Sequence, residues 1–320
     1  MPRIIFFHEQ EAAVSLKWVH SIDLPEHIAP GGFDHAAIHQ ASQRLYMAHT
    51  ANNALDVIDC ENERYLHSIS GLTGVAGALV SAEREMVFTS NRGEDTVGIF
   101  CPEDEAGLFK VPVGARPNGL AFDPDSGCLL AANVGSPELP GSFTLSIVDI
   151  HKRAMVASIP VPGRTRWTIF DPVAKEFHVN IAEPAQIVVV KAGQPDRIAR
   201  TMDIPAAGPH GLDLDLKTGR LFCACDEGKL VTLEAATGRI LAVTGLSGKP
   251  DVIFFHPFLK HLYVAIGDPG VIDVFDTDTM DKLETVVTEV GAHTIAMDDM
   301  RNKVYAFLPQ THRASEYMDE

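Results

Sequence analysis

The sequence predicts an all-β fold, a seven-bladed β-propeller whose blades are four-stranded antiparallel sheets. Three observations support this prediction. One segment recurs seven times, each interval holds runs of strand-forming residues bounded by turn residues, and the 3.6-residue periodicity of helices is nearly absent. Four short strands in each period of 41–48 residues are typical of a propeller blade.

The repeated segment is an apolar strand, a polar hairpin and a second strand that opens on aromatic or aliphatic residues. Successive copies are 41, 42, 48, 44, 41 and 42 residues apart. The long interval includes the insert 135–142, whose Gly, Pro and Ser content predicts a surface loop. The copies begin at His35, Ala76, Asn118, Arg166, His210, Asp251 and His293.

A third and a fourth strand follow the repeated segment. The third strands are expected at 54–59, 96–100, 144–149, 186–190, 229–234 and 271–276, and fourth strands at 65–69, 154–161, 239–243 and 283–287. β-branched and aromatic residues fill these runs, and Gly, Pro, Asp and Asn separate them.

The N-terminal segment is predicted to complete the last blade. The seventh copy reaches only its third strand, at 313–318, before the sequence ends at Glu320, whereas residues 17–24 resemble a spare fourth strand. Pairing the two would close the ring and cover both open sheet edges. Because each copy buries its faces only against its neighbours, residues 1–320 are expected to form a single domain.

Composition excludes several classes of protein. The 320 residues include 26 Lys and Arg against 43 Asp and Glu, a net charge of −17, which argues against a nucleic-acid partner. No apolar run reaches the roughly 20 residues that span a bilayer, and Ile4–Phe7 is too short for the core of a signal peptide. Five cysteines without a CxxC pair favour free thiols and a cytoplasmic location.

The start of each copy indicates which residues surround the channel. The innermost strand of a blade runs along the channel, so its first residue is expected at one rim. Blades five, six, seven and one are neighbours in the ring, and they contribute His210, Asp251, His293 and His35. Three imidazoles and a carboxylate are therefore expected on one arc.

This arc predicts a metal site. His35, His210 and His293 would bind a divalent ion such as Zn, Fe, Mn or Ni, with Asp251 as a fourth ligand, an orienting group or a catalytic group. Such an ion polarises a carbonyl or lowers the pKa of bound water. The histidines are also compatible with a simpler role as solvated ends of strands, and a one-residue slip in register would turn them away.

The opposite arc predicts an anion site. Asn118, Arg116, Arg166 and the nearby Arg164 would hold a small anionic substrate, because guanidinium groups bind carboxylate or phosphate with paired hydrogen bonds. Trp167 would stack on a substrate ring or belong to the blade core.

Loops after the second strands supply further candidates. Glu183 and Asp226 are possible general bases, and His49 and His312 flank the arc from the other side, with His49 a candidate for substrate binding. Asn and Asp in such loops commonly form turns instead. The other loop residues considered are Asn52, Asn91, Arg92, Asn133, Asn180, Cys225 and Asp268.

The second-strand motif points to a family. YMAH (46–49), FHVN (177–180) and YVAI (263–266), together with RPNGLAFDP (116–124) and GPHGLDLD (208–215), resemble the YVTN-type seven-bladed propellers of the lactonase-like group. No strand ends in the Trp-Asp pair of WD40 blades. The group includes 6-phosphogluconolactonase-like and muconate-lactonising enzymes and proteins without known activity. The matching motifs specify blade packing, so no catalytic role is transferred from the group.

These observations lead to three functional hypotheses. The first is a cytoplasmic metal-dependent hydrolase or lyase that acts on a small carboxylated or lactone-like metabolite at the channel mouth. The second is a metal-free lactonase or isomerase that uses His and Arg side chains. The third is a non-catalytic binding or scaffold propeller. The sequence leaves the oligomeric state open.

Overall fold

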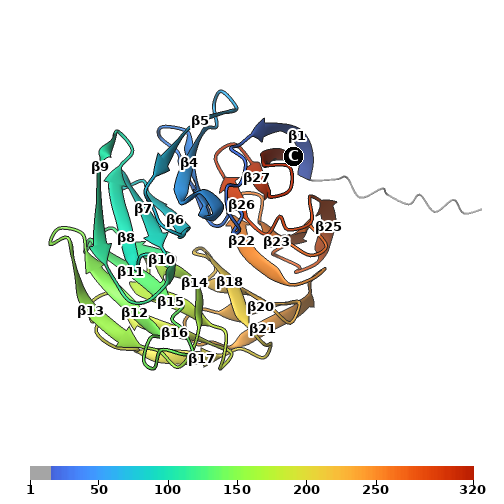
Figure 1. The fold of residues 1–320 in the computed structure, drawn as a ribbon. Coiled ribbons are helices and arrows are strands. Elements are labelled where there is room, and N and C mark those ends of the chain that lie inside the picture. Colours follow the sequence, from blue (N-terminus) through green and yellow to red (C-terminus); the bar gives the residue numbers. More distant parts are fainter. Residues whose placement is uncertain (1–15) are drawn as a thin grey trace, which may run out of the picture.

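The computed structural model describes residues 16–320, which form seven four-stranded antiparallel sheets arranged as a ring around a channel (Figure 1). The predicted fold class is therefore confirmed. The one helical element in this part of the chain is the single 3₁₀ turn η1 (Thr50–Asn52). No helix of the described residues is long and apolar enough to cross a membrane.

The strands of each blade follow one another from the channel outward. The innermost strands are β2 (Ala36–His39), β6 (Val75–Ser81), β10 (Pro117–Asp123), β14 (Thr165–Asp171), β18 (Pro209–Asp215), β22 (Pro250–His256) and β26 (Ile295–Asp298). The second strands are β3 (Arg44–His49), β7 (Met86–Asn91), β11 (Cys128–Asn133), β15 (Glu176–Ile181), β19 (Arg220–Cys225), β23 (His261–Ile266) and β27 (Lys303–Leu308). The third strands are β4 (Ala54–Asp59), β8 (Thr96–Cys101), β12 (Thr144–Asp149), β16 (Gln186–Lys191), β20 (Lys229–Glu234), β24 (Val271–Asp276) and β28 (Arg313–Asp319). The outermost strands are β5 (Arg64–Ser70), β9 (Asp104–Pro112), β13 (Ala154–Pro160), β17 (Arg200–Asp203), β21 (Ile240–Gly245), β25 (Lys282–Val287) and β1 (Leu16–Asp23).

The N-terminal strand completes blade seven, as the sequence predicts. β1 pairs antiparallel with β28, from Leu16 opposite Asp319 to Asp23 opposite Arg313. Blade seven therefore contains strands from both ends of the described chain, and each of the seven blades has four strands.

The core lies between blades rather than in one central mass. The second strands are almost wholly buried, with Phe88, Phe177 and Phe222 inaccessible to solvent, because both faces of each sheet contact neighbouring blades. The outermost strands are more exposed, and β21 alternates between half-buried and exposed residues. Burial on both faces explains the continuous apolar runs in the second and third strands.

The first residues of the inner strands leave the regular pairing. In five blades the register between the inner and second strand shifts close to the rim, and the residues skipped there are Ala76, Asn118 with Gly119, Arg166 with Trp167, His210, and Asp251 with Val252. A bulge bends a strand and redirects its side chains. In blades one and seven, His35 and His293 lie just before the inner strand. The local irregularity therefore releases the rim side chains from the sheet.

Candidate functional site

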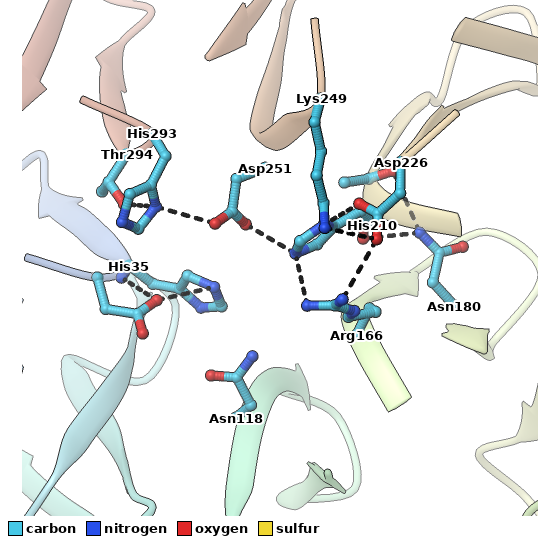
Figure 2. Close-up of polar contacts among 12 residues, drawn as sticks. His35, Asn118, Arg166, Asn180, His210, Asp226, Lys249, Asp251, His293 and Thr294 are labelled. Atoms are coloured by element: carbon cyan, nitrogen blue, oxygen red, sulfur yellow. Dashed lines mark hydrogen bonds and ion pairs between the residues drawn. The ribbon is translucent and has the colours of Figure 1, made fainter. Parts of the chain in front are cut away.

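Four charged or titratable side chains form a continuous chain of contacts at the rim (Figure 2). His210 lies between two carboxylates, with Nδ1 2.7 Å from Asp226 Oδ1 and Nε2 3.0 Å from Asp251 Oδ1. The second oxygen of Asp251 lies 2.9 Å from His293 Nδ1. Blades five, six and seven are thus linked by the sequence of contacts Asp226–His210–Asp251–His293.

The carboxylates favour the charged imidazolium form of both histidines. Burial alone would lower the pKa of His210, but the charges and hydrogen bonds of Asp251 and Asp226 raise it. Burial acts in the same direction on His293, and Asp251 outweighs it and raises the pKa of His293 to about 9. Burial would raise the pKa of Asp251, yet the two imidazoles hold it well below its usual value.

His293 is the member of the chain that remains open to a ligand. Its Nδ1 is held by Asp251, with the Thr294 hydroxyl 3.3 Å away, whereas the structure gives its Nε2 no hydrogen-bond partner among the described residues. Its side chain is 36% exposed, against 11% for His210. Both nitrogens of His210 face carboxylates, so His210 orients the network and His293 presents a free N–H at the mouth.

His35 lies at the same rim but has different surroundings. Its Nε2 is 3.4 Å from Asp34 Oδ1, and its ring packs on Trp167 with the centroids 4.2 Å apart. Burial lowers the pKa of His35, and the charge of Asp34 only partly opposes this effect. His35 is therefore favoured in its neutral form, unlike the two other rim histidines.

Guanidinium groups gather on the other side of the mouth. Arg166 lies 3.2 Å from His210 Nε2 and 3.3 Å from Asp226 Oδ2. Arg92 donates a hydrogen bond to the Asn118 side chain and lies 3.3 Å from Asp34. The Nε atoms of both arginines are buried and have no hydrogen-bond partner among residues 16–320. Each guanidinium thus keeps donor capacity that the surrounding side chains do not use.

Arg164 and Arg116 add to this positive charge. Within residues 16–320, no carboxylate lies within 4.0 Å of the guanidinium group of either arginine. Burial, together with repulsion by Arg166, Arg92 and Arg116, lowers the pKa of Arg164. Arg164 and Arg116 are both exposed. Exposed guanidinium groups that repel one another are a favourable place for an anion to bind.

The structure separates the other predicted site residues. Asp226 belongs to the network and also lies 3.3 Å from Lys249. Glu183 is exposed and makes none of the contacts of the network. His49 is fully buried inside blade one, where Nδ1 contacts Asp56 at 2.8 Å and Nε2 contacts His27 at 2.7 Å. The prediction that His49 binds substrate at the mouth therefore has no geometric support, because its ring nitrogens are both engaged within the blade.

The three rim histidines do not converge in the structure. Among residues 16–320, the His, Cys, Asp and Glu ligand atoms that gather within 4.8 Å of one another belong to His20, Glu63 and Glu316, not to His35, His210 and His293. A metal ion shared by the rim histidines stays a prediction, and it requires these side chains to move.

His20, Glu63 and Glu316 lie outside the rim, where β1 pairs with β28 to complete blade seven. There the ammonium group of Lys303 is 2.7 Å from Glu316 Oε1 and 3.6 Å from Glu63 Oε1. A positive charge is therefore already in place between these carboxylates, and we assign no ion to them.

Sequence reasoning did not assign a role to Asp34 or Lys249. A usable signal exists, because the residue two positions before the rim residue in the repeat is basic in three blades. These residues are Arg116 before Asn118, Arg164 before Arg166, and Lys249 before Asp251. Asp34 directly precedes His35, but nothing in the repeat marks it.

Comparisons with known proteins identify the fold and no closer relationship. No family model matches the chain, and no curated protein matches it. Among solved structures, the chain is similar to a chain of hydrazine synthase from Kuenenia stuttgartiensis, with a TM-score of 0.78 and 13% sequence identity over 91% of this chain and 96% of that chain. The predicted membership of the YVTN-type, lactonase-like group stays a prediction. At this identity the likeness shows the fold alone: the chain is a seven-bladed β-propeller.

Proposed function

We propose that the rim is an acid–base active site for a small anionic metabolite, carboxylated or lactone-like, and that it works without a metal ion. One observation carries the proposal. His293 is held through Nδ1 by the partly buried carboxylate of Asp251 and presents its other nitrogen at an open mouth that also contains unneutralised guanidinium groups. An imidazole oriented by a carboxylate is a common acid–base arrangement.

The arginines would bind and orient the substrate. Arg166 and Arg92 have unused buried donors, and Arg164 has no carboxylate within ion-pair distance among the described residues. A carboxylate or phosphate accepts paired hydrogen bonds from such groups, and its negative charge relieves their mutual repulsion. This arrangement explains how a protein with a net charge of −17 would attract an anion locally.

His293 would perform the proton transfer. In the imidazolium form, its Nε2–H protonates the lactone carbonyl oxygen as water adds to the carbonyl carbon, and the neutral ring takes a proton from the added water. The ring then donates this proton to the leaving oxygen as the carbon–oxygen bond breaks, and it regains a proton from the carbonyl oxygen as the carboxyl group forms. Asp251 stabilises the imidazolium and holds the ring orientation, while His210 and Asp226 fix Asp251 from its other side. The guanidinium groups would stabilise negative charge that develops on oxygen.

The geometry of the histidines supports this scheme. Both nitrogens of His210 and Nδ1 of His293 already face carboxylates. The metal-dependent hypothesis would need the rings of His210, His293 and His35 to turn toward one another.

The test compares carboxylated γ- and δ-lactones with their uncarboxylated analogues, using proton release after treatment with EDTA. We expect turnover of a carboxylated lactone that survives chelation, and a higher KM for the analogue without the carboxylate. Loss of turnover on chelation would support the metal-dependent hypothesis. No turnover together with no binding of citrate by calorimetry would support a non-catalytic propeller and contradict the proposal.

A further inference from the structure

A second site lies inside the channel, below the rim. A cavity of about 380 Å³ follows the inner strands of blades two to six, and His35 and Trp167 lie at its rim end. At its other end it reaches the turns that follow these strands, at Glu83, Pro124, Pro172 and Leu216. Leu216 is 51% exposed, so the cavity opens on the face opposite the rim. A volume of this size suits a small organic ligand.

The walls of this cavity are apolar and aromatic. Four aromatic side chains line it, namely Trp167, Phe122, Phe170 and Phe254. Among the described residues that line it, none is Lys or Arg. Aromatic faces carry negative electrostatic potential, so such walls favour apolar groups and cations over anions.

One carboxylate is built into the wall. Asp213, on β18, accepts hydrogen bonds from the backbone N–H of Phe255 at 2.6 Å and of Leu214 at 2.8 Å. Each oxygen is thereby fixed in place and keeps a further lone pair for another donor. Burial raises the pKa of Asp213 to about 6, which the two backbone hydrogen bonds only partly oppose. Glu83, at the mouth, adds a second carboxylate.

We propose that this cavity binds an organic ammonium compound with an aromatic or aliphatic body, its body against the aromatic walls and its ammonium group on Asp213. The attraction has two parts. A cation gains energy over aromatic faces, and it also forms a charge-assisted hydrogen bond with the fixed carboxylate. Glu83 would attract the cation to the opening.

This site is separate from the proposed active site in place and in charge. The rim holds Arg92, Arg164 and Arg166, whereas the cavity holds only acidic and neutral side chains among the residues that line it. His35 stands at the boundary, and because burial lowers its pKa it adds no fixed positive charge toward the cavity. Binding of a cation here therefore does not depend on any activity at the rim.

The test uses 2-phenylethylammonium and its neutral analogue 2-phenylethanol, at pH 8 where Asp213 is ionised. Trp167 lines the cavity, and the other tryptophan, Trp18, lies on β1 and is 62% exposed. A Trp18→Phe protein therefore reports the cavity alone by tryptophan fluorescence. We expect a saturable signal change and at least tenfold tighter binding of the ammonium compound than of the alcohol.

Variants then locate the charge that is responsible. With Asp213→Asn, the ammonium compound should bind less than twofold more tightly than the alcohol. With Glu83→Gln at the opening, the preference for the ammonium compound should fall by less than a factor of three. Saturating citrate, which is directed at the rim, should leave the binding unchanged. The proposal is wrong if neither compound gives a saturable signal, if the unmutated cavity binds both equally well, or if a folded Asp213→Asn protein keeps the full preference. The first two outcomes need no substitution in the cavity, so they hold even where Asp213→Asn fails to fold.

Discussion

The two ends of the channel are built from the same inner strands but differ in charge and in polarity. At the rim, bulges release charged side chains from the strands, and Arg166 stands beside His210, whose pKa is raised, as is that of His293. Toward the opposite face, the inner and second strands are regularly paired and the side chains that line the cavity are mostly apolar, with Asp213 as a fixed carboxylate in the wall and Glu83 at the opening. The difference shows that the repeat defines the scaffold, whereas local irregularity in pairing determines where polar chemistry is placed.

The largest effect that we expect separates catalysis at the rim from binding at the other end. His293→Gln should lower kcat for a carboxylated lactone by about 10²–10⁴-fold, because it removes the proton donor. Binding of 2-phenylethylammonium to the same variant should be unchanged. His151→Gln, a histidine substitution on the exposed face of blade three, is the matched control. Near-normal turnover by His293→Gln would remove this residue from the mechanism.

A second comparison contrasts the carboxylate of Asp251 at the rim with that of Asp213 in the cavity wall. Asp251→Asn should lower the free energy of unfolding by about 2–3 kcal/mol, because it leaves the facing nitrogens of His210 and His293 without their counter-charge. Asp213→Asn should cost less than about 1 kcal/mol, since burial already disfavours the charge of Asp213. Urea unfolding measures both values, with exposed Asp196→Asn as the control. An equal loss in the free energy of unfolding for Asp251→Asn and Asp213→Asn would contradict this difference between the two carboxylates.

Anion binding should depend on Arg164. Arg164→Ala is expected to weaken citrate binding roughly tenfold, the equivalent of one lost charge-assisted hydrogen bond. Its stability should not fall, because repulsion by Arg166 and Arg92 disfavours the charged Arg164 side chain in the folded protein. Calorimetry measures the affinity, and exposed Arg239→Ala serves as the control. Unchanged citrate affinity would place the anion site elsewhere.

The smallest effect is a difference in the pH at which each end loses stability. The raised pKa of His293 contributes stability that is fully present below its unfolded value of 6.5 and is lost as pH rises through about 9. The raised pKa of Asp213 contributes stability that is present below 3.8 and is lost as pH rises through about 6. Unfolding free energies of His293→Gln and Asp213→Asn, each compared with the parent across pH 4–9, should therefore diverge in different windows. If the difference in unfolding free energy between variant and parent does not change with pH for either variant, the raised pKa values of His293 and Asp213 are both contradicted.

Much of the rim was predictable from the sequence because the repeat has a fixed register. His35, His210, Asp251 and His293 occupy equivalent positions in the copies, and the structure places all four at one end of the channel. His49 was not predictable in this way. It occupies a loop-flanking position in the sequence, but Asp56 and His27, two side chains from outside its own strand, hold it inside blade one.

The sequence by itself determined the propeller, its seven blades and the closure by the N-terminal strand, because strand patterning and turn residues are local and repeat along the chain. Only the tertiary structure decided which side chains meet. Asp251 turns its two oxygens toward histidines of two different blades, and Asp213 turns toward the backbone of the neighbouring blade. These partners lie about 40 residues apart in the chain, and their contact depends on the angle between blades and on the bulges at the rim, neither of which is encoded by local periodicity.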